Sequence, residues 1–274
     1  MKNLIRFGIV QGRLTQSPPN CLQWFPQEFW EKEFRIAADL GIDYIELIAE
    51  TEHNEKNPIW SNEGQKKIKK LVKENDLTLH ALCNDFIIKN SLLNDKVIQQ
   101  NIDLINQGKN LQVEKYVMPL FEESELNTKN MHDFVDPIRK VANAAIENNM
   151  LTCLETILTG EELIEFLKLI NLPYVKVVYD TGNRVAFGHN LPRDIRLLNN
   201  NIAHIHIKDK NIINENTLLG TGLVNFEEVF YALNDINYDG PFTFETVRGS
   251  NPIKTANYNM QLVEFFKLNA ETNV

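Results

Sequence analysis

Hydrophobic positions along this chain repeat with two different periods. Short runs rich in β-branched and aromatic residues alternate with longer stretches in which apolar residues recur every three or four positions. The first pattern predicts β-strands and the second predicts amphipathic helices. Strands are predicted at residues 4–10, 44–49, 77–83, 115–120, 151–156, 175–181, 202–208 and 242–246. Helices are predicted near residues 28–40, 61–75, 95–111, 131–149, 160–170, 192–200, 225–236 and 252–268.

Eight successive strand-then-helix units indicate how the chain folds. Such alternation is typical of parallel strands joined by right-handed crossovers, and eight units predict a closed (β/α)₈ TIM barrel. Asn225 and Gly41 stand where a helix N-cap and a helix C-cap are expected. An open doubly wound sheet is the alternative, but "GIVQGRL" at the first strand lacks the G-x-G-x-x-G spacing of that fold. No repeat or linker divides the chain, so we expect one barrel domain over residues 1–274.

The composition of the chain argues against nucleic-acid binding and against a membrane protein. The chain has 28 Lys and Arg residues against 37 Asp and Glu residues, and the resulting net charge of −9 disfavours a nucleic-acid-binding surface. The sequence contains no run of roughly 18 apolar residues and no signal-peptide pattern, so we expect a cytoplasmic protein that does not bind membranes. Cys21, Cys83 and Cys153 are odd in number and widely spaced, which predicts neither a disulfide framework nor a thiolate metal site.

Polar side chains mark the ends of the last four predicted strands. Strand 5 ends at Glu155, strand 6 at Asp180, strand 7 at His206 and strand 8 at Glu245. Barrel active sites gather at the carboxyl ends of strands, and alternate residues of neighbouring strands face the interior together. We therefore expect these four groups to converge at the mouth of the barrel.

Three crowded carboxylates would repel one another unless a cation held them together. Three carboxylates and one imidazole favour Mn²⁺ or Mg²⁺, with Co²⁺ and Zn²⁺ as alternatives. The sequence therefore predicts a metal site formed by Glu155, Asp180, His206 and Glu245. His204 shares a strand face with His206, and we expect it to lie deeper in the barrel, as an interior residue or behind a ligand.

Motifs spread over nearly the whole chain carry a family resemblance. They are "GIVQGRL", "AADLGIDYIEL", "LET", "YDTGN", "HIHIKD", "GTGLVNFEEVFYAL" and "YDGPFTFET". With them the chain resembles the xylose isomerase-like TIM-barrel superfamily of sugar and sugar-phosphate isomerases and epimerases. The resemblance implies that the four polar groups are metal ligands and that the relatives associate as dimers or tetramers. It also implies that Glu155 and Glu245 exchange protons with the substrate. Many members have a histidine three residues after the strand-6 aspartate, where this chain has Asn183.

The reaction implied is proton abstraction next to a carbonyl, through an enediolate that the metal stabilises. Glu155 and Glu245 are the expected acid–base pair, while Asp180 and His206 chiefly hold the ion. Other candidate substrate-binding groups are Glu46, His80, Asn183, Lys208, Arg248 and Arg13. The basic residues among them, together with Lys210, are candidate phosphate anchors, and "LGTGLVN" before the next helix is a further candidate phosphate loop.

Three other functions fit parts of the pattern. A sugar dehydratase would use the same metal and base to expel a hydroxyl group. A barrel that binds a metabolite without catalysis would need no metal. A DNA-repair endonuclease of the same fold uses a histidine-rich zinc site, and the six histidines, Asn183 and the acidic charge of this chain argue against it.

Overall fold

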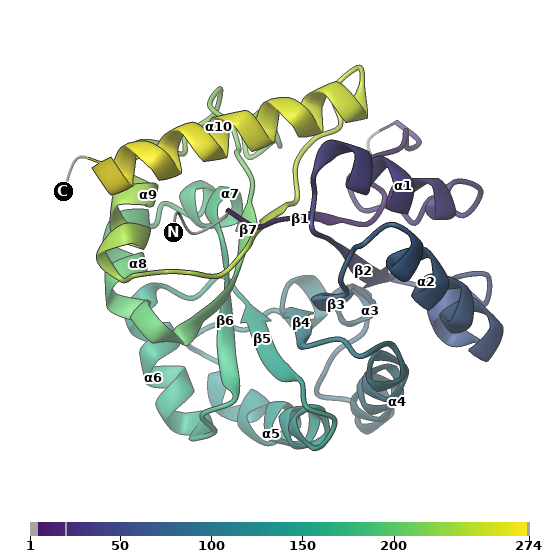
Figure 1. Ribbon diagram of the computed structural model, residues 1–274. Helices are drawn as coiled ribbons and strands as arrows, with labels where there is room; N and C mark the ends of the chain where they lie inside the picture. The colour runs from purple at the N-terminus through teal and green to yellow at the C-terminus, as the bar shows by residue number, and fades with distance from the viewer. Residues whose placement is uncertain (1–4, 20, 273–274) are drawn as a thin grey trace.

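The predicted closed barrel is confirmed in the computed structural model, which describes residues 5–19 and 21–272 (Figure 1). Each strand pairs in parallel with the next, and the last strand pairs with the first. The strands are β1 (Phe7–Val10), β2 (Tyr44–Ala49), β3 (Ala81–Asn84), β4 (Lys115–Pro119), β5 (Leu151–Glu155), β6 (Val175–Asp180), β7 (Ile202–Ile207) and β8 (Phe242–Phe244).

A ring of helices surrounds the strands, so that nearly every strand residue is buried (Figure 1). The helices are α1 (Trp30–Leu40), α2 (Asn62–Glu74), α3 (Phe86–Lys89), α4 (Asp95–Leu111), α5 (Met131–Glu147), α6 (Gly160–Ile170), α7 (Thr181–Ala186), α8 (Leu191–Leu198), α9 (Phe226–Asp235) and α10 (Pro252–Thr272). Short 3₁₀ turns lie at η1 (Pro58–Trp60), η2 (Glu122–Ser124) and η3 (Asn199–Asn201). In the described part of the chain, no helix combines the length and the apolar character needed to cross a membrane.

The predicted elements match these closely, with differences at their ends. Strand 4–10 is shorter than predicted, because β1 begins at Phe7, and Leu4 lies outside the described residues. The third strand begins only at Ala81, four residues later than predicted. Helices α3 and α7 were not predicted, because four and six residues are too few to show a helical period.

Local signals explain several helix ends. The Asn225 side chain accepts from the backbone N–H of Glu228, as predicted for an N-cap. Gly41 ends α1 in the left-handed conformation, with φ at 81°. Thr159 and Glu162 form a reciprocal capping box at the start of α6.

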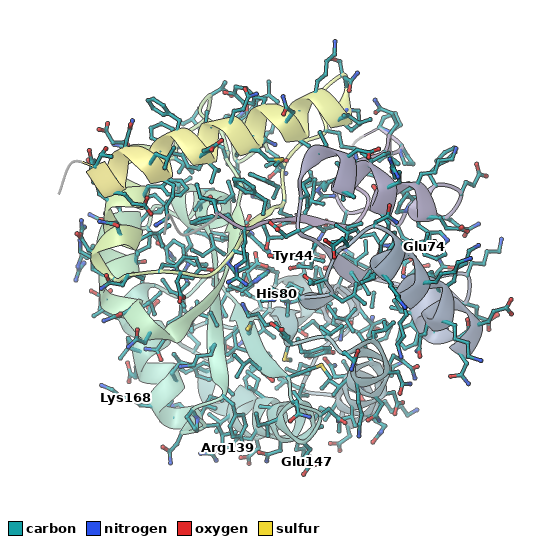
Figure 2. All side chains as sticks on the ribbon, viewed as in Figure 1. Tyr44, Glu74, His80, Arg139, Glu147 and Lys168 are labelled. Atoms are coloured by element: carbon teal, nitrogen blue, oxygen red, sulfur yellow. The ribbon has the colours of Figure 1, made fainter. Side chains whose placement is uncertain are left out.

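Tyr44 and His80 pack together inside the barrel near the amino ends of the strands. A Cβ atom on Gly8 would lie only 2.0 Å from the Tyr44 ring, so glycine is required beside this tyrosine. The Tyr44 hydroxyl bonds the Thr243 hydroxyl, and its ring lies 4.9 Å from the His80 ring (Figure 2). These groups lie next to a cavity that His80 and Lys115 line at the amino end of the barrel.

A long loop between β1 and α1 is tied to the carboxyl end of the barrel. The buried Glu33 carboxylate accepts from the backbone N–H groups of Gly12 (2.7 Å) and Leu14 (3.0 Å). Arg248, after β8, donates to the carbonyls of Gly12 (2.7 Å) and Cys21 (2.9 Å). These contacts hold the loop close to the carboxyl ends of β1 and β8.

Gly12 is the position at which this loop tolerates least change. Its φ is 87°, and an added Cβ would lie 1.9 Å from the Trp24 carbonyl oxygen. Gly12→Ala is expected to lower the free energy of unfolding by about 2–5 kcal/mol, since the left-handed backbone costs about 1–2 kcal/mol and overpacking about 1–3 kcal/mol. Gly41→Ala is the control, because φ there is 81° with no atom within 4 Å. Equal destabilisation of the two variants in urea unfolding would contradict the packing argument.

Candidate active site

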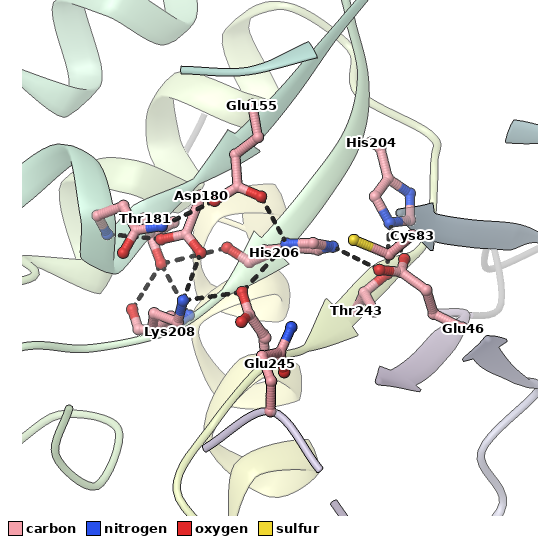
Figure 3. A network of polar contacts seen from close by, with 12 residues as sticks. Glu46, Cys83, Glu155, Asp180, Thr181, His204, His206, Lys208, Thr243 and Glu245 are labelled. Carbon is pink, nitrogen blue, oxygen red and sulfur yellow. Dashed lines mark hydrogen bonds and ion pairs between the residues drawn. The ribbon is translucent and has the colours of Figure 1, made fainter. Parts of the chain in front are cut away.

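Four polar side chains from β5, β6, β7 and the residue after β8 meet at the carboxyl end of the barrel (Figure 3). They are Glu155, Asp180, His206 and Glu245, and one potential ligand atom from each lies within 4.8 Å of the others. Each residue is between 1% and 6% exposed. The structure therefore brings together the four residues predicted as metal ligands, in an arrangement that could hold a metal ion.

Strand register explains why these residues lie at one level. Asp180 pairs with His206 across β6 and β7. The pairing shifts by one residue between Val177 and Val178, and this irregularity sets the two side chains side by side. On the other side of β7, His206 pairs with Thr243, so Glu245 comes two residues later on the same face as Thr243.

Two cationic side chains lie against the group formed by Glu155, Asp180, His206 and Glu245, which we call the acidic cluster. Lys208 Nζ lies 2.8 Å from Glu245 Oε2 and 3.2 Å from Asp180 Oδ2. Arg13 Nη2 lies 3.5 Å from Glu245 Oε1, and its guanidinium also donates to Leu22 O and Gln23 Oε1. Both were predicted as substrate or anion anchors; Lys208 lies inside the cluster, and Arg13 links Glu245 to the loop above it.

The two glutamates of the cluster differ in acidity. Burial and then the neighbouring Asp180 carboxylate raise the pKa of Glu155 to about 8. Burial would also raise the pKa of Glu245, but Lys208, His206 and Arg13 outweigh it and hold that pKa well below its usual range. At neutral pH one carboxyl group therefore tends to keep its proton and the other to remain ionised.

His206 offers one free nitrogen to the cluster. Its Nδ1 lies 3.3 Å from Glu245 Oε2 and 3.7 Å from Glu155 Oε2, with no well-aligned hydrogen-bond partner. Burial would lower the pKa of His206, but Glu46 and Glu245 outweigh it and hold that pKa well above its usual range, so in the metal-free protein His206 tends to carry a proton toward the acids. A divalent cation could take the place of that proton. The buried nitrogen and the acids around it therefore fit a divalent cation.

Glu46 and His204 lie beneath the cluster rather than in it. Glu46 Oε1 lies 3.1 Å from His206 Nε2, and Oε2 lies 2.6 Å from His204 Nε2. Both carboxylate oxygens are thus engaged, whereas Glu46 was predicted to accept a substrate hydroxyl. His204 is fully buried one pleat below His206, in the deeper position that was expected for it.

Asn183 contacts the cluster from the first turn of α7. Its Nδ2 donates to Glu155 Oε1 at 2.7 Å, and its backbone N–H donates to Asp180 Oδ1 at 2.6 Å. The side chain predicted to contact substrate therefore orients Glu155 directly.

Some predicted contacts lie elsewhere. His80 lies at the amino end of the barrel, where Nε2 contacts Lys115 Nζ (2.7 Å) and Nδ1 contacts Glu114 (2.9 Å), so we leave it out of the substrate site. Arg248 bonds the loop carbonyls described above. Lys210 bonds Asn214 Oδ1 at 2.8 Å.

The segment 219–225, predicted as a phosphate-binding loop, already has its backbone N–H groups bonded within the protein. The backbone N–H groups of Gly220, Gly222 and Val224 donate to the Asp209 carboxylate at 3.0, 2.8 and 3.1 Å. These amides are therefore not free to bind an anion, and the fully buried Asp209 organises the segment instead.

Asp85 and Cys83 are two residues near the mouth that the sequence reasoning missed. Burial, followed by the Glu245 charge, raises the pKa of Asp85 to about 7, which indicates that it lies within electrostatic range of the cluster. Cys83 Sγ lies 3.4 Å from Asp85 Oδ1. Asp85 directly follows β3, as Glu245 follows β8, but it lies two residues beyond the strand predicted at 77–83 and was therefore not selected.

The chain is similar in sequence and in fold to several sugar epimerases. The chain is 22% identical over 233 residues to L-ribulose-5-phosphate 3-epimerase UlaE of Shigella boydii, covering 80% of this chain and 82% of the relative. Its fold resembles D-psicose 3-epimerase of Clostridium cellulolyticum, with 18% identity, a TM-score of 0.75, and coverage of 96% and 99% of the two chains. It also resembles 3-keto-D-glucoside 4-epimerase of E. coli, with 16% identity, a TM-score of 0.72, and coverage of 96% and 100%.

A family model agrees with the motifs and with the closed barrel. The model described as the xylose isomerase-like TIM barrel matches residues 34–267. The match includes β2 to β8 and all four residues of the acidic cluster. This chain therefore belongs to the xylose isomerase-like TIM barrel family.

Proposed function

We propose that this chain is a divalent-metal-dependent epimerase or isomerase of a ketose or ketose phosphate. The observation that carries the proposal is the pair Glu155 and Glu245, buried on either side of His206 in one cluster with Asp180 (Figure 3). Two carboxyl groups that can approach a substrate carbon from different sides are suited to act as base and acid. The relatives named above act on ketose phosphates, ketoses and a keto-glucoside, which supports the substrate class.

In the proposed reaction, Glu155 and Glu245 exchange protons with a carbon next to the substrate carbonyl. One carboxylate removes a proton, and the other returns a proton to the opposite face in epimerisation, or to the neighbouring carbon in isomerisation. Asn183 holds the Oε1 atom of Glu155 in place. Lys208 and Arg13 keep Glu245 ionised between them.

Asp180 and His206, with the two glutamates, would hold the cation. A bound divalent cation supplies a Lewis acid that polarises the substrate carbonyl and stabilises the negative charge left by proton removal. Three carboxylates and one imidazole suit Mn²⁺ or Mg²⁺ better than a thiolate-preferring metal. All four residues are buried, which limits their own contact with water.

Substitution of either glutamate tests the proposed reaction. Glu155→Gln and Glu245→Gln are each expected to reduce turnover at least about 100-fold, because a positioned proton-transfer group contributes about 10²–10⁴-fold. Turnover is measured as deuterium incorporation from heavy water into ketoses and ketose phosphates with Mn²⁺ present. Glu114→Gln, at the opposite end of the barrel, is the control and should keep the wild-type rate.

The assay also separates the proposed reaction from its rivals. Loss of water from the substrate would identify a dehydratase. If the wild-type protein takes up no divalent cation and exchanges no deuterium with any sugar of the panel, the proposal is wrong and a barrel that only binds a metabolite is favoured. Wild-type exchange rates in either glutamine variant would remove the role given to that glutamate.

The pKa of Glu155 predicts how metal binding depends on pH. Because this carboxyl group keeps its proton below about pH 8, a cation must displace that proton at lower pH. The affinity for Mn²⁺ is expected to rise at least about tenfold per pH unit from pH 6 to pH 8, with release of at least one proton near pH 7, because the pKa of His206 is raised as well. Calorimetry in two buffers of different ionisation enthalpy measures both quantities. An affinity that does not change over this range would contradict the prediction.

The raised pKa of Glu155 also predicts how the stability of the metal-free protein changes with pH. Since the pKa of Glu155 is about 8 in the folded chain and 4.5 in the reference state, folding favours the protonated form. The metal-free protein should therefore lose stability as the pH rises from about 4.5 to about 8, and Mn²⁺ should restore it. Thermal unfolding across this range, with Mn²⁺ and with a chelator, measures the effect. A metal-free protein that gains stability over the same window would show that other groups dominate.

A further inference from the structure

Glu46 is a carboxylate that reaches His206 from the far side of the barrel. Glu46 belongs to β2 and His206 to β7, and these strands are not neighbours in the closed strand order. The Glu46 side chain has no exposed surface. Its Oε1 lies 3.1 Å from His206 Nε2, on the side of the His206 ring opposite Glu155 and Glu245 (Figure 3).

We propose that Glu46 is a positioning residue that holds His206 as an Nδ1 ligand of the divalent cation. The inference rests on the metal centre of the proposed function. It assigns Glu46 a role in metal binding in place of the substrate contact expected from the sequence.

Hydrogen-bond chemistry determines which nitrogen faces the cluster. A neutral imidazole has one N–H donor and one lone pair, whereas an ionised carboxylate can only accept. A histidine that binds a metal must be neutral, and in that state the contact with Glu46 favours the proton on Nε2 and the lone pair on Nδ1, the nitrogen that faces Glu155 and Glu245. A carboxylate behind a ligand histidine fixes the orientation of its ring and makes the ligand nitrogen more basic.

The other oxygen of Glu46 is anchored, so the carboxylate cannot turn away from His206. Oε2 lies 2.6 Å from His204 Nε2. That nitrogen also lies 3.2 Å from Thr243 Oγ1, which bonds the Tyr44 hydroxyl near the amino ends of the strands. The alternate positions of His204 and His206 on one strand thus place one imidazole on each oxygen of the same carboxylate.

Glu46→Gln removes the charge but keeps the size of the side chain. It is expected to weaken Mn²⁺ binding 10–100-fold, the usual effect of changing a residue behind a metal ligand. The matched control is Glu114→Gln, because Glu114 also contacts a histidine, His80, at 2.9 Å at the opposite end of the barrel. Dissociation constants for Mn²⁺ are measured by competition with a chelator, and the control should match the wild-type value.

Nitrogen-15 NMR of histidine in the wild-type protein loaded with Mg²⁺ or Zn²⁺ gives a second test that needs no variant. The inference predicts a proton on His206 Nε2 and a metal bond at Nδ1. A proton on Nδ1 in the metal-loaded protein would overturn it, as would equal affinities of Glu46→Gln and Glu114→Gln. If the wild-type protein binds no divalent cation, the metal centre of the proposed function fails and this inference fails with it; unchanged affinity in a metal-binding protein overturns this inference alone.

Discussion

The candidate site depends on the neutralisation of carboxylates that are buried together at one end of the barrel. Moving a single carboxylate into a protein interior costs several kcal/mol unless opposite charges and hydrogen bonds compensate. Here Lys208 and Arg13 compensate Glu245, but Glu155 keeps a pKa raised to about 8 by burial and the Asp180 charge. Without a metal, protons held on Glu155 and His206 offset the remaining charge of the cluster, and a divalent cation could take their place.

Two successive residues after β7, Lys208 and Asp209, point in different directions and have different contacts. Lys208 turns into the acidic cluster, while the next residue, Asp209, accepts three backbone N–H groups of residues 220–224. One short segment thus supplies a cation to the site and an anion to the neighbouring loop. Asp209 accepts the hydrogen bonds of the backbone N–H groups that could have bound a phosphate. Any phosphate on the substrate would therefore have to be recognised by other groups.

Much of the fold was predictable because the period of apolar residues is a local property. The eight strands and their order follow from it, and the four cluster residues follow from the rule that polar strand ends meet at the mouth. The level of a residue along the barrel is harder to predict, because it depends on where a strand begins. His80 shows this: β3 starts after it, so it lies at the amino end. The partners of Arg13 and Arg248 are carbonyls of a long loop, whose path is set by tertiary contacts rather than by sequence period.

Asn183 shows how a departure from the family pattern is accommodated. An imidazole at this position could titrate near neutral pH, whereas an amide cannot act as a base there. The amide instead donates to Glu155 Oε1, while Glu155 Oε2 faces His206 Nδ1. One oxygen of the glutamate is thus fixed by a neutral donor, and the other remains directed at the centre of the cluster. Asn183 adds no proton-transfer group of its own, so the acid–base chemistry proposed for this chain depends on the two glutamates.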